Sequence, residues 1–145
     1  YLQRHKQISE YDSENLMCAV IQSVLTEEAF SSMDCAVHVS LATLIKDDAL
    51  LTEAERLYAH NPLTHVDFLL FRKMDKQPTL AIEVDGTRFH APGSKQAERD
   101  AKKDCIMGKC GIMLLRLRTD GSGEPEKIRA ALQSVSRQPS AQPEI

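Results

Sequence analysis

The apolar residues of this 145-residue chain recur with two different spacings, one typical of helices and one of strands, which alternate along the sequence. Between residues 13 and 30 they recur every three or four positions, which predicts an amphipathic helix capped by Asp12 or Ser13. The stripe that this helix would bury consists of Leu16, Met17, Val20, Ile21, Val24 and Leu25. Residues 36–41 alternate loosely between apolar and polar and contain β-branched side chains, so they predict a strand.

Two short apolar runs, 66–71 and 79–86, follow a segment that is rich in helix-forming residues. That segment, 47–59, is expected to be an ordered helix or a mobile loop, and Pro62 marks its exit. Residues 73–78, between the two apolar runs, contain three charged residues and end in a proline, which is typical of a turn. Two strands joined in this way predict an antiparallel hairpin.

The rest of the chain predicts a helix, a strand and a second helix. Ser94 is a suitable N-cap for a helix over 94–109, whose end Gly108 and Gly111 bracket. Residues 112–119 are strongly apolar and predict a strand buried on both faces. Residues 126–136 predict a short final helix. This order of elements predicts an α/β fold in which a mixed sheet is flanked by helices.

Three carboxylates interrupt the apolar hairpin strands: Asp67, Glu83 and Asp85. With the hairpin centred near residue 75, paired residues sum to about 150, so Asp67 lies opposite Glu83. Asp85 shares their face because strand side chains alternate. Crowded carboxylates repel one another, and a hard divalent cation relieves the repulsion. We therefore expect a metal site there, with a solvated acidic patch as the alternative.

The two faces of the hairpin are expected to differ in burial. Leu69, Phe71 and Ala81 share the acidic face and make it partly apolar, which argues against a plain solvent-exposed patch. The opposite face is expected to be core and consists of Val66, Phe68, Leu70, Leu80, Ile82 and Val84.

Composition fits one globular domain, with 42% hydrophobic and 27% charged residues and no tryptophan. No apolar run approaches the roughly 20 residues of a membrane span, and the first residues do not resemble a signal peptide. The cysteines form no CxxC pair and are expected to be small buried thiols in a reducing compartment. We therefore expect a cytoplasmic protein without a membrane partner. The four cysteines are Cys18, Cys35, Cys105 and Cys110.

Charge is distributed unevenly along the chain, whose formal net charge is −3. Residues 67–118 contain eleven Lys or Arg against seven Asp or Glu, so this segment is basic while the rest is acidic. A basic surface around an acidic metal pocket suits a phosphodiester substrate, although an ordinary mixed surface has the same totals. We expect residues 1–11 to be a linker or frayed end of a longer protein, 12–136 a single domain, and 137–145 a disordered tail.

A larger set of residues extends this pattern: Asp67, the sequence Glu83-Val84-Asp85-Gly86, His90, the helix segment 99–104 and the strand 112–118. Together they resemble the restriction-endonuclease-like PD-(D/E)XK nuclease superfamily. The branch most similar to them ends a strand with E-V-D-G and includes very-short-patch-repair-type endonucleases and domains appended to larger chains. The resemblance covers roughly residues 12–119 and implies an α-β-β-β-α-β core, which is the order of elements inferred above.

The resemblance implies a role for each matching residue. Asp67 matches the metal-binding aspartate of the second core strand, and Glu83 matches the acidic residue of the (D/E)XK motif. The main-chain carbonyl of Val84 would be a further metal ligand, and Glu14 matches an acid often found on the first core helix. The implied cofactor is Mg²⁺ or Mn²⁺. The implied partners are DNA, or else RNA, and other domains of a larger DNA-processing protein.

One position departs from the superfamily motif: Asp85 stands where lysine is usual. The very-short-patch-type enzymes have histidine there and another histidine five residues on, and His90 keeps that second spacing. In relatives without the strand lysine, a basic residue can come from the following helix, where Arg99 and Lys103 lie one turn apart. The residues expected to bind nucleic acid are Arg88, Arg99 and Lys102.

The implied chemistry is metal-assisted phosphodiester hydrolysis. Asp67 and Glu83 would hold Mg²⁺, which polarises a phosphoryl oxygen and lowers the pKa of the attacking water. The base that takes the proton from this water is Lys103, Asp85 or His90. Because the strand lysine is replaced, the alternative is an inactive nuclease-fold module that binds nucleic acid or a partner protein. A metal-binding or purely structural α/β module is a third reading.

Helical spacing argues against a role for Lys103. Its helix is expected to bury a stripe of small residues, and Lys103 lies about 200° around the helix from Ala101, a member of that stripe. The lysine would then point away from the core, and Arg99 is the fallback. The expected stripe consists of Ala97, Ala101, Cys105 and Gly108.

Overall fold

The structure, a computed structural model, describes residues 12–85, 93–119 and 121–137. The expected linker over 1–11 and the tail from residue 138 lie outside the described residues, and Arg137, expected in the tail, is the last residue of a helix. The helices are α1 (Asp12–Leu25), α2 (Glu53–Ala59), α3 (Lys95–Cys110) and α4 (Glu124–Arg137). The strands are β1 (Met33–Ser40), β2 (His65–Arg72), β3 (Pro78–Val84) and β4 (Met113–Leu117). Short 3-10 helices are η2 (Glu28–Phe30), η3 (Leu41–Leu44) and η4 (Asp48–Leu50).

The strands form a mixed sheet in the order β1-β2-β3-β4 within the described residues. β1 and β3 each lie antiparallel to β2, whereas β4 lies parallel to β3 after the crossover through α3. The predicted register of the hairpin is confirmed, because Phe68 pairs with Ile82 and Leu70 with Leu80. The predicted α/β fold with a mixed sheet flanked by helices is therefore confirmed.

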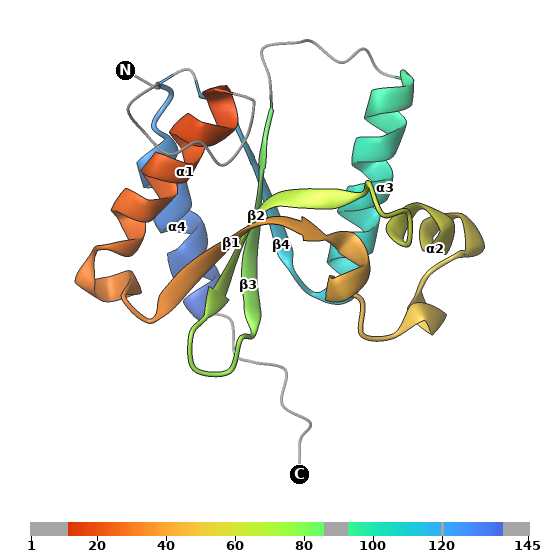
Figure 1. The fold of residues 1–145 in the computed structure, drawn as a ribbon, viewed down its shortest axis with the longest axis horizontal. Helices are drawn as coiled ribbons and strands as arrows, with labels where there is room; N and C mark the ends of the chain where they lie inside the picture. The colour runs from red at the N-terminus through yellow and green to blue at the C-terminus, as the bar shows by residue number, and fades with distance from the viewer. Residues whose placement is uncertain (1–11, 86–92, 120, 138–145) are drawn as a thin grey trace.

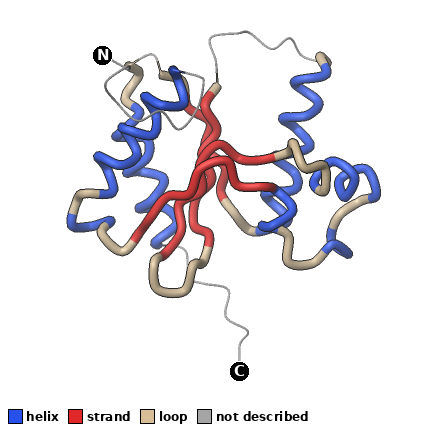
Figure 2. The backbone as a smooth tube through the Cα atoms, in the orientation of Figure 1, coloured by secondary structure: helices blue, strands red, loops and turns tan. Residues whose placement is uncertain are grey.

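Helices cover both faces of this sheet, as Figures 1 and 2 show. α1 and α4 pack together on one face, while α2 and α3 lie on the other. The helix ends follow the local sequence. The Ser94 hydroxyl accepts a hydrogen bond of 3.1 Å from the backbone N–H of Ala97, so the predicted cap is confirmed. Gly111 ends α3 at φ 74°, a conformation that favours glycine.

Buried apolar side chains form two clusters within the described part of the chain, one on each face of the sheet. Phe68 and Ile82 belong to the cluster under α1 and α4, and Leu69 and Ala81 belong to the cluster under α3. The predicted core face thus holds, except that Val66 packs in the second cluster. The alternation of side chains between the two sheet faces fails at this end of β2. The neighbouring residue on β1 is His38, whose φ of 51° does not occur in an ideal strand.

The buried face of α3 differs from the predicted one. Ala101, Cys105 and Gly108 are exposed, whereas Ile106 and Met107 are buried. The half-buried residues of this helix include Asp100, Lys103 and Cys110, which share the inner face with Ile106 and Met107. The expectation that Lys103 points away from the core is therefore wrong. Small side chains do not set the orientation of this helix, because its two large apolar residues do so instead.

Two other burial expectations are also wrong. The strand β4 was expected to be buried on both faces, but its residues are half-buried until Leu117. The four cysteines were expected to be buried, but Cys105 is exposed and the other three are half-buried. All four are free thiols. No helix in the described ranges is long and apolar enough to cross a membrane.

We expect substitutions in α3 to follow the observed face. Gly108→Ala should raise the free energy of unfolding by about 0.5–1 kcal/mol, because a methyl group there meets no atom within 4 Å and alanine favours helix. Ile106→Ala should lower it by about 2–5 kcal/mol, since that side chain is fully buried. Urea unfolding measures the free energy of unfolding of both variants. A loss of stability in Gly108→Ala would instead support the buried face of α3 that was expected from the sequence.

Candidate functional site

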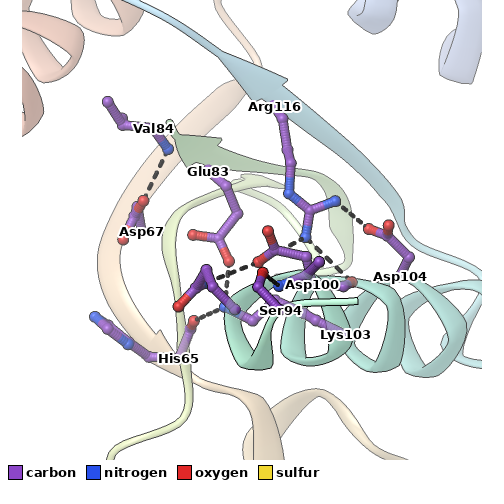
Figure 3. Close-up of polar contacts among 11 residues, drawn as sticks. His65, Asp67, Glu83, Val84, Ser94, Asp100, Lys103, Asp104 and Arg116 are labelled. Carbon is purple, nitrogen blue, oxygen red and sulfur yellow. Dashed lines mark hydrogen bonds and ion pairs between the residues drawn. The ribbon is translucent and has the colours of Figure 1, made fainter. Parts of the chain in front are cut away.

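The hairpin brings the two central carboxylates together. Asp67 and Glu83 are the next residues beyond the Phe68–Ile82 pair and interact electrostatically, in agreement with the sequence prediction. The Asp67 Oδ2 accepts a hydrogen bond of 2.8 Å from the backbone N–H of Val84 (Figure 3). Glu83 is buried, with 9% of its surface exposed. Two carboxylates thus share a largely desolvated place at the end of the hairpin.

This proximity changes the acidity of Asp67. Burial and, to a smaller extent, the negative charge of Glu83 together raise the pKa of the Asp67 carboxyl to about 8. The hydrogen bond from the Val84 N–H acts in the opposite direction but does not compensate. The part of this shift that comes from neighbouring negative charge also favours a bound cation, which would have to displace the proton.

Lys103 supplies a positive charge to the pair. Its Nζ lies in an ion pair with Glu83 Oε1 and donates a hydrogen bond of 2.9 Å to the carbonyl of His65 (Figure 3). The side chains of Lys103 and Glu83 are only 13% and 12% exposed. α3 therefore brings a cation to the buried Glu83 carboxylate.

Arg116 on β4 connects α3 to the sheet through ion pairs. In the parallel pairing of β3 and β4, Arg116 is the partner of Glu83. Its guanidinium forms an ion pair with Asp104 and lies 3.8 Å from the carboxylate of Asp100, both on α3 (Figure 3). Because Lys103 lies between these two aspartates in sequence, the contacts of Arg116 help to fix where the Lys103 ammonium points.

Glu14 approaches the site from the other layer. It is buried in α1, with 7% of its surface exposed, and its negative charge is among the causes of the raised pKa of Asp67. The Nε2 of His38 lies 3.3 Å from Glu14 Oε1, and the His38 ring lies 4.9 Å from that of His65. α1, β1, β2, β3 and α3 thus each contribute a charged or ionisable side chain to this region.

The other predicted site residues are less closely joined to the pair. The backbone N–H of Asp85 donates to the carbonyl of Leu117 at 2.8 Å, which ties the end of β3 to β4, and the convergence of its side chain with the pair stays a prediction. Arg99 is exposed on α3, and Lys102 is half-buried there. His90 and Arg88 lie outside the described residues. Over the described ranges, no group of three or more His, Cys, Asp or Glu side chains is arranged to hold a metal ion.

Sequence reasoning missed His38, His65 and Arg116. A histidine in a strand and an arginine in an apolar run carry no spacing signal of their own. The one available signal was the register of the sheet, since a fourth strand parallel to β3 places one of its residues beside Glu83. That signal needed the strand order, which the sequence pattern alone does not give.

The chain matches the profile of one protein family over residues 8–135, which includes α1 and nearly all of α4. That family is described as "Protein of unknown function (DUF2726)". The chain belongs to this family. No curated protein and no solved structure matches the chain significantly. The family description gives no activity, so the chemistry of the site has to be inferred from its own residues.

We expect Asp67→Asn to stabilise the metal-free protein increasingly as the pH rises. The unfolded carboxyl loses its proton near pH 3.8, whereas burial and Glu83 keep the folded one protonated up to about pH 8. The parent therefore loses stability between these values, and asparagine does not titrate. The gain should be negligible at about pH 4 and exceed about 1 kcal/mol at pH 8 in urea titrations with EDTA.

A matched control is Asp75→Asn in the turn between β2 and β3. The backbone N–H of Gln77 and the side chain of Arg72 lower the pKa of Asp75, so its charge favours the folded state. This substitution should therefore destabilise the protein at neutral pH and lose its effect as the pH falls. Equal effects of Asp67→Asn at both pH values would show that Asp67 does not hold a raised pKa.

Proposed function

We propose that this domain is a metal-dependent nuclease that hydrolyses phosphodiester bonds in DNA. The observation that carries the proposal is the meeting of Asp67, Glu83 and Lys103 at the end of the hairpin, with Asp67 driven to a raised pKa. Two carboxylates and a lysine in this arrangement match the acidic and basic groups of the PD-(D/E)XK superfamily. The proposed lysine comes from α3 and not from β3.

Mg²⁺, or Mn²⁺, fits the donor set. Mg²⁺ usually binds one or two carboxylates and keeps several waters, so the absence of a described three-residue cluster does not conflict with it. Asp67 and Glu83 would hold the ion, with the carbonyl of Val84 as the further ligand that the superfamily resemblance implies. When bound, the ion polarises the phosphoryl oxygen and lowers the pKa of water.

The residues of the chain have separate tasks in this proposal. Lys103 stabilises the negative charge that develops on the phosphate, from a position already beside Glu83. Arg116 holds α3 through Asp100 and Asp104, so that the lysine keeps this position. The general base stays open among the candidates Lys103, Asp85 and His90.

A second candidate is a nuclease-fold module that binds nucleic acid or a partner protein without cutting. Two observations favour it: Asp85 replaces the strand lysine, and Lys103 already neutralises the motif carboxylate Glu83 in an ion pair. Cleavage assays separate the two candidates, because both retain the fold but only one requires a metal at the carboxylates.

We expect the protein to cut single-stranded, duplex or branched DNA with Mg²⁺ or Mn²⁺ and to stop when EDTA removes the metal. Glu83→Gln should abolish cleavage, and Lys103→Ala should slow it at least about a hundredfold, because charge stabilisation at the phosphate is lost. Lys73→Ala, an exposed lysine in the hairpin turn, is the control. Failure of the parent on all three substrates with both metals would exclude the nuclease function.

Metal should also stabilise the folded protein. Mg²⁺ at one hundred times its Kd raises the free energy of unfolding by about 2.7 kcal/mol through mass action. Lys103→Ala should unfold more easily without metal, since it leaves Glu83 buried and uncompensated, and it should gain more from Mg²⁺ than the parent. Thermal melts with and without millimolar Mg²⁺ measure this, and an unchanged melting temperature in both proteins would exclude metal binding here.

A further inference from the structure

Tyr58 on α2 lies next to the carboxylate site, although nothing in its sequence context marks it. α2 packs against α3, and the half-buried Tyr58 ring lies against the apolar cluster beneath them. The Lys102 Nζ lies 5.5 Å from the centre of this ring, over its face. Lys102 directly precedes Lys103, so the ring and its cation stand beside the lysine that contacts Glu83.

The phenol lies within electrostatic reach of the charged side chains of the site. Burial raises the pKa of Tyr58, and the charges of Lys103, Glu83, Asp100 and Arg99 also act on it. The hydroxyl therefore remains a hydrogen-bond donor at neutral pH. Among the residues that the structure describes, none hydrogen-bonds this hydroxyl, and its oxygen is not fully buried. An accessible donor without an acceptor is available to a ligand.

Lys102 differs from the neighbouring lysines in what it contacts. Lys103 is paired with Glu83, and Lys109 is paired with Glu55. Within the described ranges, Lys102 has no carboxylate partner and meets only the π-face of Tyr58. Its positive charge is held in place by the ring but is not neutralised, which is the state of a lysine that can bind an anion. Arg99, one helical turn earlier, is exposed on the same helix.

We propose that Tyr58, Lys102 and Arg99 bind a backbone phosphate of the nucleic acid, one next to the phosphate that is cleaved. This inference rests on the proposed nuclease function and adds a substrate contact from α2, an element outside the motif. The Tyr58 hydroxyl donates to a phosphate oxygen, and Lys102 and Arg99 supply charge. Because phosphates carry no base identity, this contact fixes the position of the strand without reading its sequence.

The test uses the 145-residue chain and two substitutions, one that removes a hydrogen-bond donor and one that removes a charge. Tyr58→Phe keeps the ring and its contact with Lys102 but removes the hydroxyl. Lys102→Gln removes the charge, and Lys73→Gln is the matched control in the hairpin turn. Binding of fluorescein-labelled single-stranded and duplex DNA is followed by anisotropy in EDTA between about 50 and 200 mM salt. Thermal melts monitor the fold.

Tyr58→Phe should weaken binding about tenfold with an unchanged salt dependence, because a neutral hydrogen bond releases no counterion. Lys102→Gln should lower the slope of log affinity against log salt by about one, whereas Lys73→Gln should leave it unchanged. A purely structural role for the ring would move neither the affinity of Tyr58→Phe nor the slope of Lys102→Gln. Parental affinity and slope in both variants overturn the inference.

Cleavage by the parent with Mg²⁺ is measured in parallel, so that the two proposals can fail separately. If the parent cuts and both variants bind as the parent does, the phosphate contact is wrong and the nuclease function stands. If the parent binds without cutting and the variants weaken binding as expected, the contact stands and the cleavage proposal fails. If the parent neither binds nor cuts, both are wrong.

Discussion

The structure depends on two carboxylates, Asp67 and Glu83, that are held side by side with little water around them. Burying carboxylates is costly unless they are paired with a cation, and within the described residues Lys103 forms an ion pair with Glu83 but not with Asp67. The raised pKa of Asp67 is the consequence, because a bound proton neutralises the Asp67 carboxylate where no second cation among these residues does so. An arrangement that lowers stability in this way is typical of functional sites, where a ligand supplies the missing charge.

The same pair explains how α3 is held against the sheet. The inner face of this helix is apolar only towards its end, where Ile106 and Met107 are buried. Nearer its start the helix meets the acidic part of the sheet, and ion pairs replace apolar packing: Lys103 with Glu83, and Arg116 with two aspartates of α3. A helix fixed at one end by packing and at the other by charge keeps its lysine in place, so the fold and the site are not separable.

This division also shows what the sequence could predict. The hairpin and its register followed from local features, namely two apolar runs, a polar turn and a period of two, and these placed Asp67 beside Glu83. The face of α3 did not follow, because hydrophobic periodicity assumes that the inner face is apolar throughout, and Lys103 breaks that assumption. The position of Arg116 needed the strand order, and that of Tyr58 needed the packing of α2 on α3.

If the proposed resemblance to the nuclease superfamily holds, the lysine that Asp85 would replace has to be sought by position in space and not by position in sequence. A phosphate senses where a positive charge lies, and the energy of that interaction depends on distance and on exclusion of water. An ammonium carried by α3 reaches the edge of Glu83 and is largely shielded from solvent there, so it meets both conditions. The helix has one further consequence, since Lys102 is the next residue and is thereby brought against Tyr58. A lysine supplied by α3 thus comes with a second cation, which a lysine supplied by the strand would not provide.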